Sequence, residues 1–94
     1  MSDVVNAAVA ALNSKVGSFG STAKFVIENE GAIMIDENGV RAGDDEAEVT
    51  LFASRDTFEG ILNGDTNPTM AYMSGKLKID GSLPAAMKLG AALS

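Results

Sequence analysis

The chain has no cysteine and no histidine among its 94 residues. Without cysteine there is no disulfide framework and no thiolate nucleophile. Without histidine the chain lacks both the commonest general base and the commonest metal ligand. Tryptophan is also absent, and aromatic residues make up 5% of the sequence. Because these residues carry so much enzyme chemistry, we expect no catalytic residue, no metal site and no cofactor.

Basic residues are few, and the acidic excess gives a net charge of −6 at pH 7. Such a charge is repelled by phosphate, so we expect no nucleic-acid partner and at most transient membrane contact. Eight of the acids lie between residues 28 and 48. They lack the glycine and the distal glutamate of an EF-hand loop, which argues against calcium binding. We interpret them as a solvated edge that protects strands from pairing with neighbours.

Long hydrophobic runs are missing as well. No apolar run approaches the roughly 20 residues that a membrane-spanning helix needs. The first residues do not combine a basic segment with a long apolar core, so they do not resemble a signal peptide, and we expect a cytoplasmic protein. The length fits one domain, which we expect to cover residues 1–94.

Hydrophobic periodicity predicts a helix first and a block of strands after it. A helical repeat of apolar residues indicates a helix over residues 3–16, ended by Gly17. Lys15 is its one basic residue, which argues against a membrane-surface helix but leaves that interpretation open. Three or four consecutive strands joined by short turns predict an antiparallel meander. Alternating patterns place these strands near residues 22–28, 33–35, 40–42 and 47–53.

Turn and cap residues set further boundaries. Asn38 and Gly39 predict a two-residue hairpin turn, because both accept positive φ. Ser54 is a good N-cap for a helix, and Asn67 followed by Pro68 is a second helix start. The sequence therefore predicts short helices over residues 54–63 and 67–74.

The last part of the chain predicts one more strand and one more helix. Residues 76–80 alternate between apolar and charged side chains, as a strand does. Ser82 is placed to cap a last helix, whose apolar stripe includes Leu83 and Met87. Helices before and after a block of strands indicate an α+β domain with helices over one face of a sheet.

Six apolar residues in the second half are candidates for a binding site. Methionine is flexible and adaptable, so it suits a core that leaves space as well as one that is filled. The spacing alone leaves both interpretations open, an ordinary core and the lining of an apolar tunnel. The six are Met70, Met73, Leu77, Ile79, Met87 and Leu89.

Four short motifs follow one another in the second half of the sequence. They are Ala47-Glu48-Val49-Thr50-Leu51, Asn67-Pro68, Gly75-Lys76-Leu77-Lys78-Ile79 and Ala86-Met87-Lys88-Leu89. In order and spacing they resemble the sterol carrier protein 2 family, and the resemblance covers about residues 19–93. It implies a five-stranded, mainly antiparallel sheet that is covered on one face by helices and encloses a hydrophobic tunnel. Family members bind fatty acids, fatty acyl-CoA, sterols or other lipids.

The resemblance implies a non-catalytic protein that binds and transfers a lipid, such as a fatty acid or another apolar molecule. It implies that the tunnel is lined by Phe58, Leu62, Met70, Met73, Leu77, Ile79, Met87 and Leu89, with Ser74 near the headgroup. Alternation turns Lys76 and Lys78 outward, which favours a free fatty acid or neutral lipid over a CoA ester. A structural or assembly module that presents a lipid-like intermediate or binds a partner enzyme remains the alternative.

Overall fold

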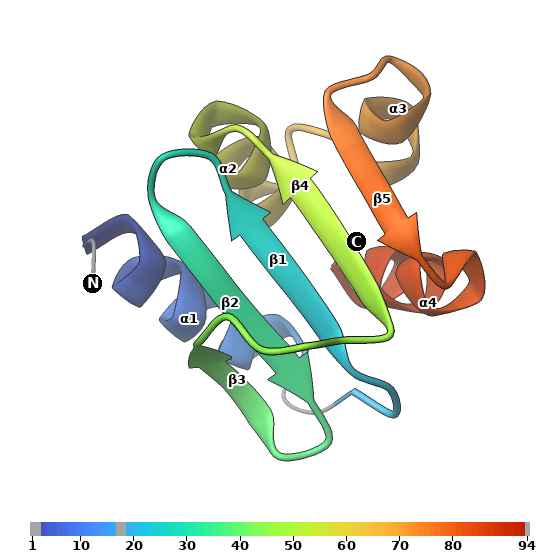
Figure 1. Cartoon of the computed structure of the whole chain (residues 1–94). Helices are drawn as coiled ribbons and strands as arrows, with labels where there is room; N and C mark the ends of the chain where they lie inside the picture. The colour runs from blue at the N-terminus through green and yellow to red at the C-terminus, as the bar shows by residue number, and fades with distance from the viewer. Residues whose placement is uncertain (1–2, 17–18, 94) are drawn as a thin grey trace.

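A computed structural model of the chain describes residues 3–16 and 19–93. In this part of the chain, four helices and five strands form the expected α+β fold (Figure 1). The helices are α1 (Asp3–Lys15), α2 (Arg55–Asn63), α3 (Pro68–Met73) and α4 (Leu83–Leu93). The strands are β1 (Ala23–Ile27), β2 (Gly31–Asp36), β3 (Gly39–Ala42), β4 (Val49–Ala53) and β5 (Leu77–Gly81). Gly17, the expected end of the first helix, lies outside the described residues.

The strands form one sheet in the order β3-β2-β1-β4-β5. The first three pair antiparallel in sequence order, as a meander does. The prediction of a meander is wrong for the fourth strand, because β4 pairs with β1 in parallel, with Ala23 opposite Val49. A parallel pair needs a crossover rather than a hairpin. Residues 43–48 supply it, and they pass over the face of the sheet that the helices leave open (Figure 1).

The crossover is long enough for this path and is held against the sheet. Moving from β3 to β4 spans three strand spacings, about 14 Å, whereas six extended residues reach about 20 Å. Asp44 in the crossover accepts a hydrogen bond from Lys24 of β1, with 2.8 Å between Nζ and Oδ1. Met34 of β2, which points to the same face, is buried. The crossover therefore covers the β1–β2 half of this face and leaves the β4–β5 half uncovered.

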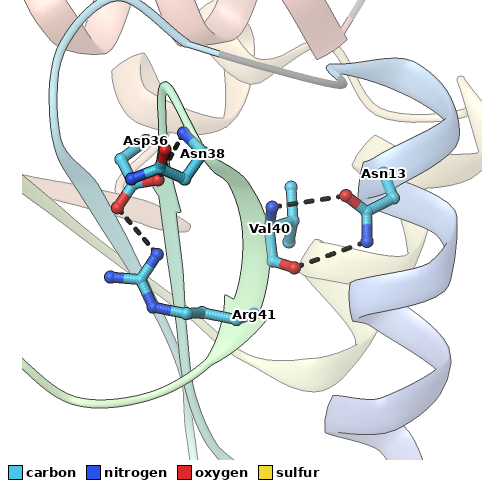
Figure 2. Close-up of polar contacts among 5 residues, drawn as sticks. All are labelled: Asn13, Asp36, Asn38, Val40 and Arg41. Atoms are coloured by element: carbon cyan, nitrogen blue, oxygen red, sulfur yellow. Dashed lines mark hydrogen bonds and ion pairs between the residues drawn. The ribbon is translucent and has the colours of Figure 1, made fainter.

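The turn between β2 and β3 lies one residue earlier than the sequence predicts. Asp36 pairs with Gly39, so the turn residues are Glu37 and Asn38, and Asn38 does not have positive φ. The Asp36 carboxylate accepts hydrogen bonds from the Asn38 N–H (2.8 Å) and from Arg41 Nη1 (2.7 Å) (Figure 2). Both hydrogen bonds hold the pKa of Asp36 below its ordinary value. The bond from Arg41 is the larger cause, and the bond from Asn38 is the next. The side chain of Asp36 thus fixes the turn that Asn38-Gly39 was expected to fix.

The outer edge of β3 is closed by a side chain of α1. Asn13 accepts a hydrogen bond from the Val40 N–H at 3.2 Å and donates one to the Val40 carbonyl at 3.4 Å (Figure 2). The amide thereby pairs with an edge strand as a neighbouring strand would, which removes a template for aggregation. It also ties α1 to the sheet beside which α1 packs.

The core lies between the helices and one face of the sheet. Val5, Ala8 and Leu12 form the buried face of α1. In α4 the buried residues are Ala85, Ala86 and Leu89, and the predicted apolar stripe is wrong, because Leu83 and Met87 are exposed. Two adjacent alanines and Leu89 form the packed face of α4, so Leu83 and Met87 project away from the core. No helix in the described part of the chain is long and apolar enough to cross a membrane.

Candidate functional site

A cleft of about 470 Å³ opens between α3, α4 and the strand β5. This volume is in the range of small-molecule sites, which is about 300–1,000 Å³. The floor is formed by Phe25 and Leu51 of the sheet and by Ile61 of α2. We call the space the α3–α4 cleft; its walls are Asn67, Pro68, Thr69, Tyr72, Met73, Leu77, Ile79, Leu83, Ala86, Met87, Gly90 and Ala91.

The position of α3 is set by its caps. Asn67 Oδ1 accepts hydrogen bonds from the backbone N–H groups of Thr69 (2.8 Å) and Met70 (3.3 Å), as the sequence predicts for an N-cap. Pro68 occupies the first turn, where its missing N–H has no cost. After the helix, Gly75 has φ 83°, a conformation that glycine accepts without strain. The chain can therefore turn back at once into β5, and α3 forms one wall of the cleft beside that strand.

The strand β5 and its turn into α4 form the opposite wall. Leu77 and Ile79 face the cleft, whereas the intervening Lys78 is exposed on the other face. Gly81 ends the strand with φ 106°, and a Cβ there would collide with the Glu48 carbonyl and Val49 Cα. A glycine is therefore required where the chain leaves the sheet and begins α4.

Four of the predicted lining residues meet in the cleft: Met73, Leu77, Ile79 and Met87. Phe58 and Leu62 do not line it; they line a second hollow of about 460 Å³ between α1 and α2. The remaining three line neither space. Met70 and Ser74 are exposed, and Leu89 is buried in the core.

Phe58 is nevertheless connected to the cleft. Its ring packs edge-to-face against Phe25, with 4.4 Å between centroids and 63° between ring planes. Phe25 belongs to the floor of the cleft, and Phe58 is fully buried behind it. The aromatic pair therefore separates the cleft from the second hollow.

Several lining residues were not among the sequence candidates. Phe25 and Leu51 occupy inward positions of alternating strands, a signal that was present in the sequence but does not distinguish a core from a cavity. Ala86 and Gly90 lie one helical turn apart on α4, and the methyl group of Ala86 and the bare Cα of Gly90 leave space between α4 and α3. Tyr72 and Leu83 complete the mouth.

The cleft is suited to binding an apolar group. A larger hollow of about 600 Å³ on the opposite face of the sheet is lined partly by the charged Glu28, Lys76 and Lys78, so it is less apolar in character. Within the described residues, no polar or charged side chain is buried in the core. In the same residues there is no group of three His, Cys, Asp or Glu side chains that could hold a metal ion.

Solved structures share this fold over the full length of the chain. The solution structure of sterol carrier protein 2 from Aedes aegypti in complex with palmitate has a TM-score of 0.79 at 20% identity, covering 100% of this chain and 97% of that one. The apo structure of sterol carrier protein 2 from Yarrowia lipolytica has a TM-score of 0.71 at 20% identity, covering 97% and 84%. These similarities confirm a five-stranded fold of this type.

A sequence relative and a family model extend the comparison. Hydroxysteroid dehydrogenase-like protein 2 from Bos taurus is 49% identical over 45 residues, which is 48% of this chain and 11% of that protein. The chain thus matches a small part of a much longer relative. The model of the SCP-2 sterol transfer family matches residues 5–94. The chain therefore belongs to the SCP-2 sterol transfer family.

Proposed function

We propose that the chain binds the alkyl chain of a fatty acid, or of a similarly apolar lipid, in the α3–α4 cleft and transfers it without changing it chemically. The observation that carries this proposal is the apolar lining of the cleft, which opens to solvent between Met73 and Met87. A relative with the same fold was solved in complex with palmitate, which supports the same ligand class here. The cytoplasmic location and the single-domain organisation expected from the sequence are part of the proposal.

Burial of the alkyl chain supplies the binding energy. Each methylene transferred from water contributes about 0.8 kcal/mol, so ten buried methylenes contribute roughly 8 kcal/mol before the cost of ordering the ligand. The cost of ordering the site itself is small, because Leu77, Ile79 and Ala86 are already held by the sheet and by α4. We therefore expect micromolar affinity. Selectivity between chains of adjacent length should be low, since one methylene more or less changes the affinity only about fourfold.

A continuous tunnel would join the cleft to the second hollow past Phe58. We propose that a long chain opens this route by turning the Phe58 ring away from Phe25, while a short chain stays within the cleft. The two spaces are similar in volume, about 470 and 460 Å³, and the aromatic pair lies between them. Phe58 and Leu62 would then line the inner half of the tunnel.

The polar end of the ligand would lie at the mouth of the cleft. Ser74, the residue expected near a headgroup, caps the end of α3 and donates its hydroxyl to the Ala71 carbonyl at 3.2 Å. Asn67 and Thr69 line the cleft and Ser74 does not. We propose that these two residues contact the headgroup in place of Ser74.

Displacement of fluorescently labelled palmitate by unlabelled saturated fatty acids tests the proposal. Affinity should fall about fourfold for each methylene removed from the competitor, the equivalent of 0.8 kcal/mol. Absence of displacement by any fatty acid would refute lipid binding. Native mass spectrometry of protein purified from its source provides a second test: a co-purified lipid supports transfer, and a stoichiometric protein without lipid would favour the assembly module.

A further inference from the structure

The two edges of the sheet differ in how they are covered. The sheet ends in β3 on one side and in β5 on the other. Asn13 closes the edge of β3, whereas within residues 3–16 and 19–93 no hydrogen bond closes the outer side of β5. An open edge carries backbone N–H and C=O groups that pair readily with a strand of another chain. The outer edge of β5 is therefore a candidate surface for protein–protein contact.

The ladder between β4 and β5 determines which residues of β5 point outward. Ser82, just after the strand, donates its N–H to the Glu48 carbonyl on the β4 side at 3.0 Å. In an antiparallel ladder such hydrogen-bonded positions recur at every second residue. The even-numbered residues of β5 therefore bond to β4. The odd-numbered ones, Leu77, Ile79 and Gly81, point their backbone N–H and C=O groups away from the sheet.

Two charged side chains of opposite sign lie along this edge. Lys78 and Asp80 are both exposed, and strand alternation places them on the face that the helices leave open. In the described part of the chain neither has an ion-pair partner. Charges on an edge strand often prevent pairing. Opposite charges directly across from each other stabilise a strand pair, however, whereas like charges destabilise it.

We propose that the outer edge of β5 pairs antiparallel with β5 of a second copy of the chain, about a two-fold axis at Ile79. In this register Ile79 pairs with Ile79 of the second copy, and Leu77 pairs with Gly81, so the outward-pointing backbone groups meet one another. Lys78 then lies opposite Asp80 of the second copy, and the symmetry forms this charge pair twice. The inference is independent of the proposed lipid transfer.

The charges favour this register over its neighbours. A two-fold axis one residue earlier would place Lys78 opposite Lys78 of the second copy, and an axis one residue later would place Asp80 opposite Asp80. Both arrangements oppose like charges, which is unfavourable. The edge of β5 is thus complementary to itself in one register. A second copy has this complementarity by symmetry, whereas a strand of an unrelated protein would have it only by chance.

The same axis brings exposed apolar side chains together. The helix α3 precedes β5 and α4 follows it, both on one face of the sheet (Figure 1). Because antiparallel pairing reverses the second strand, α3 of one copy would lie near α4 of the other. An edge of five residues is small for a stable interface, so apolar contact between these helices would add to it. In the described part of the chain, α3 and α4 carry five of the six exposed large apolar residues: Met70, Tyr72, Met73, Leu83 and Met87.

Sedimentation equilibrium at up to about 1 mM protein tests the dimer, in about 0.15 M salt, where charges beyond roughly 8 Å are screened. Wild type should reach twice the monomer mass. Lys78→Glu and Asp80→Lys each make both charge pairs repulsive, so each should weaken the dimer about tenfold or more. The two variants change the net charge of −6 in opposite directions, so net charge cannot explain a loss in both. Lys15→Glu, on the helix beside β3, is the control and should stay within about twofold of wild type.

Mixing the two variants tests the register. In a mixed dimer of Lys78→Glu with Asp80→Lys, both charge pairs are again of opposite sign, so an equimolar mixture should associate about as tightly as wild type. The double variant Lys78→Glu/Asp80→Lys should do so as well. Wild type that stays monomeric at the highest concentration would overturn the proposal. So would a mixture that fails to associate, or single variants that dimerise as tightly as wild type.

Palmitate displacement separates this inference from the proposed function. Lys78 and Asp80 lie on the face of the sheet opposite the cleft and do not line it. At a dilution where wild type is monomeric, both single variants should therefore bind palmitate as wild type does, which also shows that they fold. A monomeric chain that binds palmitate would refute the dimer alone. A chain that dimerises through β5 and binds no fatty acid would refute the transfer function alone.

Discussion

Gly90 offers the sharpest test of the cleft, because filling it should stabilise the fold and weaken ligand binding at the same time. Gly90 lies within α4 and lines the cleft. A Cβ added there would meet one neighbouring atom within 4 Å, the Pro68 Cβ at 3.7 Å, which is ordinary contact. A side chain at this position therefore has room to enter the cleft without pushing the helices apart.

The magnitudes follow from helix propensity and from the volume filled. Replacing a mid-helix glycine by alanine or leucine stabilises the helix by about 1 kcal/mol. If each added carbon displaces about one ligand methylene, Gly90→Ala weakens fatty-acid binding about fourfold. Gly90→Leu adds four carbons, which corresponds to about 3 kcal/mol and about 200-fold weaker binding.

Urea unfolding and palmitate displacement measure the two effects on the same preparations. Ala92→Leu is the control, because Ala92 is exposed on the same helix and does not line the cleft. It should change neither the affinity nor the stability by much. If Gly90→Leu folds and binds palmitate as tightly as wild type, the ligand does not occupy the space between α3 and α4.

Three further predictions concern the mouth, the edge strand and the β2–β3 turn. Met87→Trp should block the mouth and abolish palmitate displacement without unfolding the protein, since Met87 is largely exposed; unchanged displacement would contradict the assigned opening. Asn13→Ala removes both hydrogen bonds to Val40 and should lower the free energy of unfolding by about 1–2 kcal/mol in urea; an unaltered midpoint would show that the edge needs no such closure. The lowered pKa of Asp36 means that its carboxylate stabilises the fold above the unfolded pKa of about 3.9, and that this contribution is lost as pH falls through the lower folded pKa. Asp36→Asn should therefore reduce the loss of stability on acidification, and a pH profile parallel to that of wild type would argue against the role of the Arg41 hydrogen bond.

The features that the sequence predicts well are those set by neighbouring residues. Ser54 and Asn67 cap α2 and α3 as expected, and Gly64 ends α2 with φ 82°. Each of these features depends on hydrogen bonds within a few residues. The parallel pairing of β1 with β4 depends instead on a path across the sheet, which no local pattern of residues 43–48 reveals.

Some residues of the candidate site were predictable from the sequence, because neighbouring residues determine the direction of their side chains. Leu77 and Ile79, both predicted as lining, face the cleft, because strand alternation fixes the direction of a side chain once the neighbours are known. Phe58 was predicted as lining but lies behind Phe25, since helical spacing does not say how deep a residue sits. The stripe of α4 was misplaced because alanine is nearly neutral in an apolar pattern, and the helix packs through Ala85 and Ala86.

The exposed methionines connect these findings. A sequence pattern assigns Met73 and Met87 to an apolar interior, yet both are about three-quarters exposed at the mouth of an apolar cleft. Burying two such side chains in a filled core would stabilise the fold by about 1.5–3 kcal/mol each. Their exposure here means that the fold lacks most of this free energy. A protein that exchanges an apolar ligand recovers part of that free energy whenever a ligand covers them. The same two side chains therefore lower the stability of the empty protein and favour the occupied one, so ligand should raise the unfolding midpoint of wild type more than that of Met73→Gln.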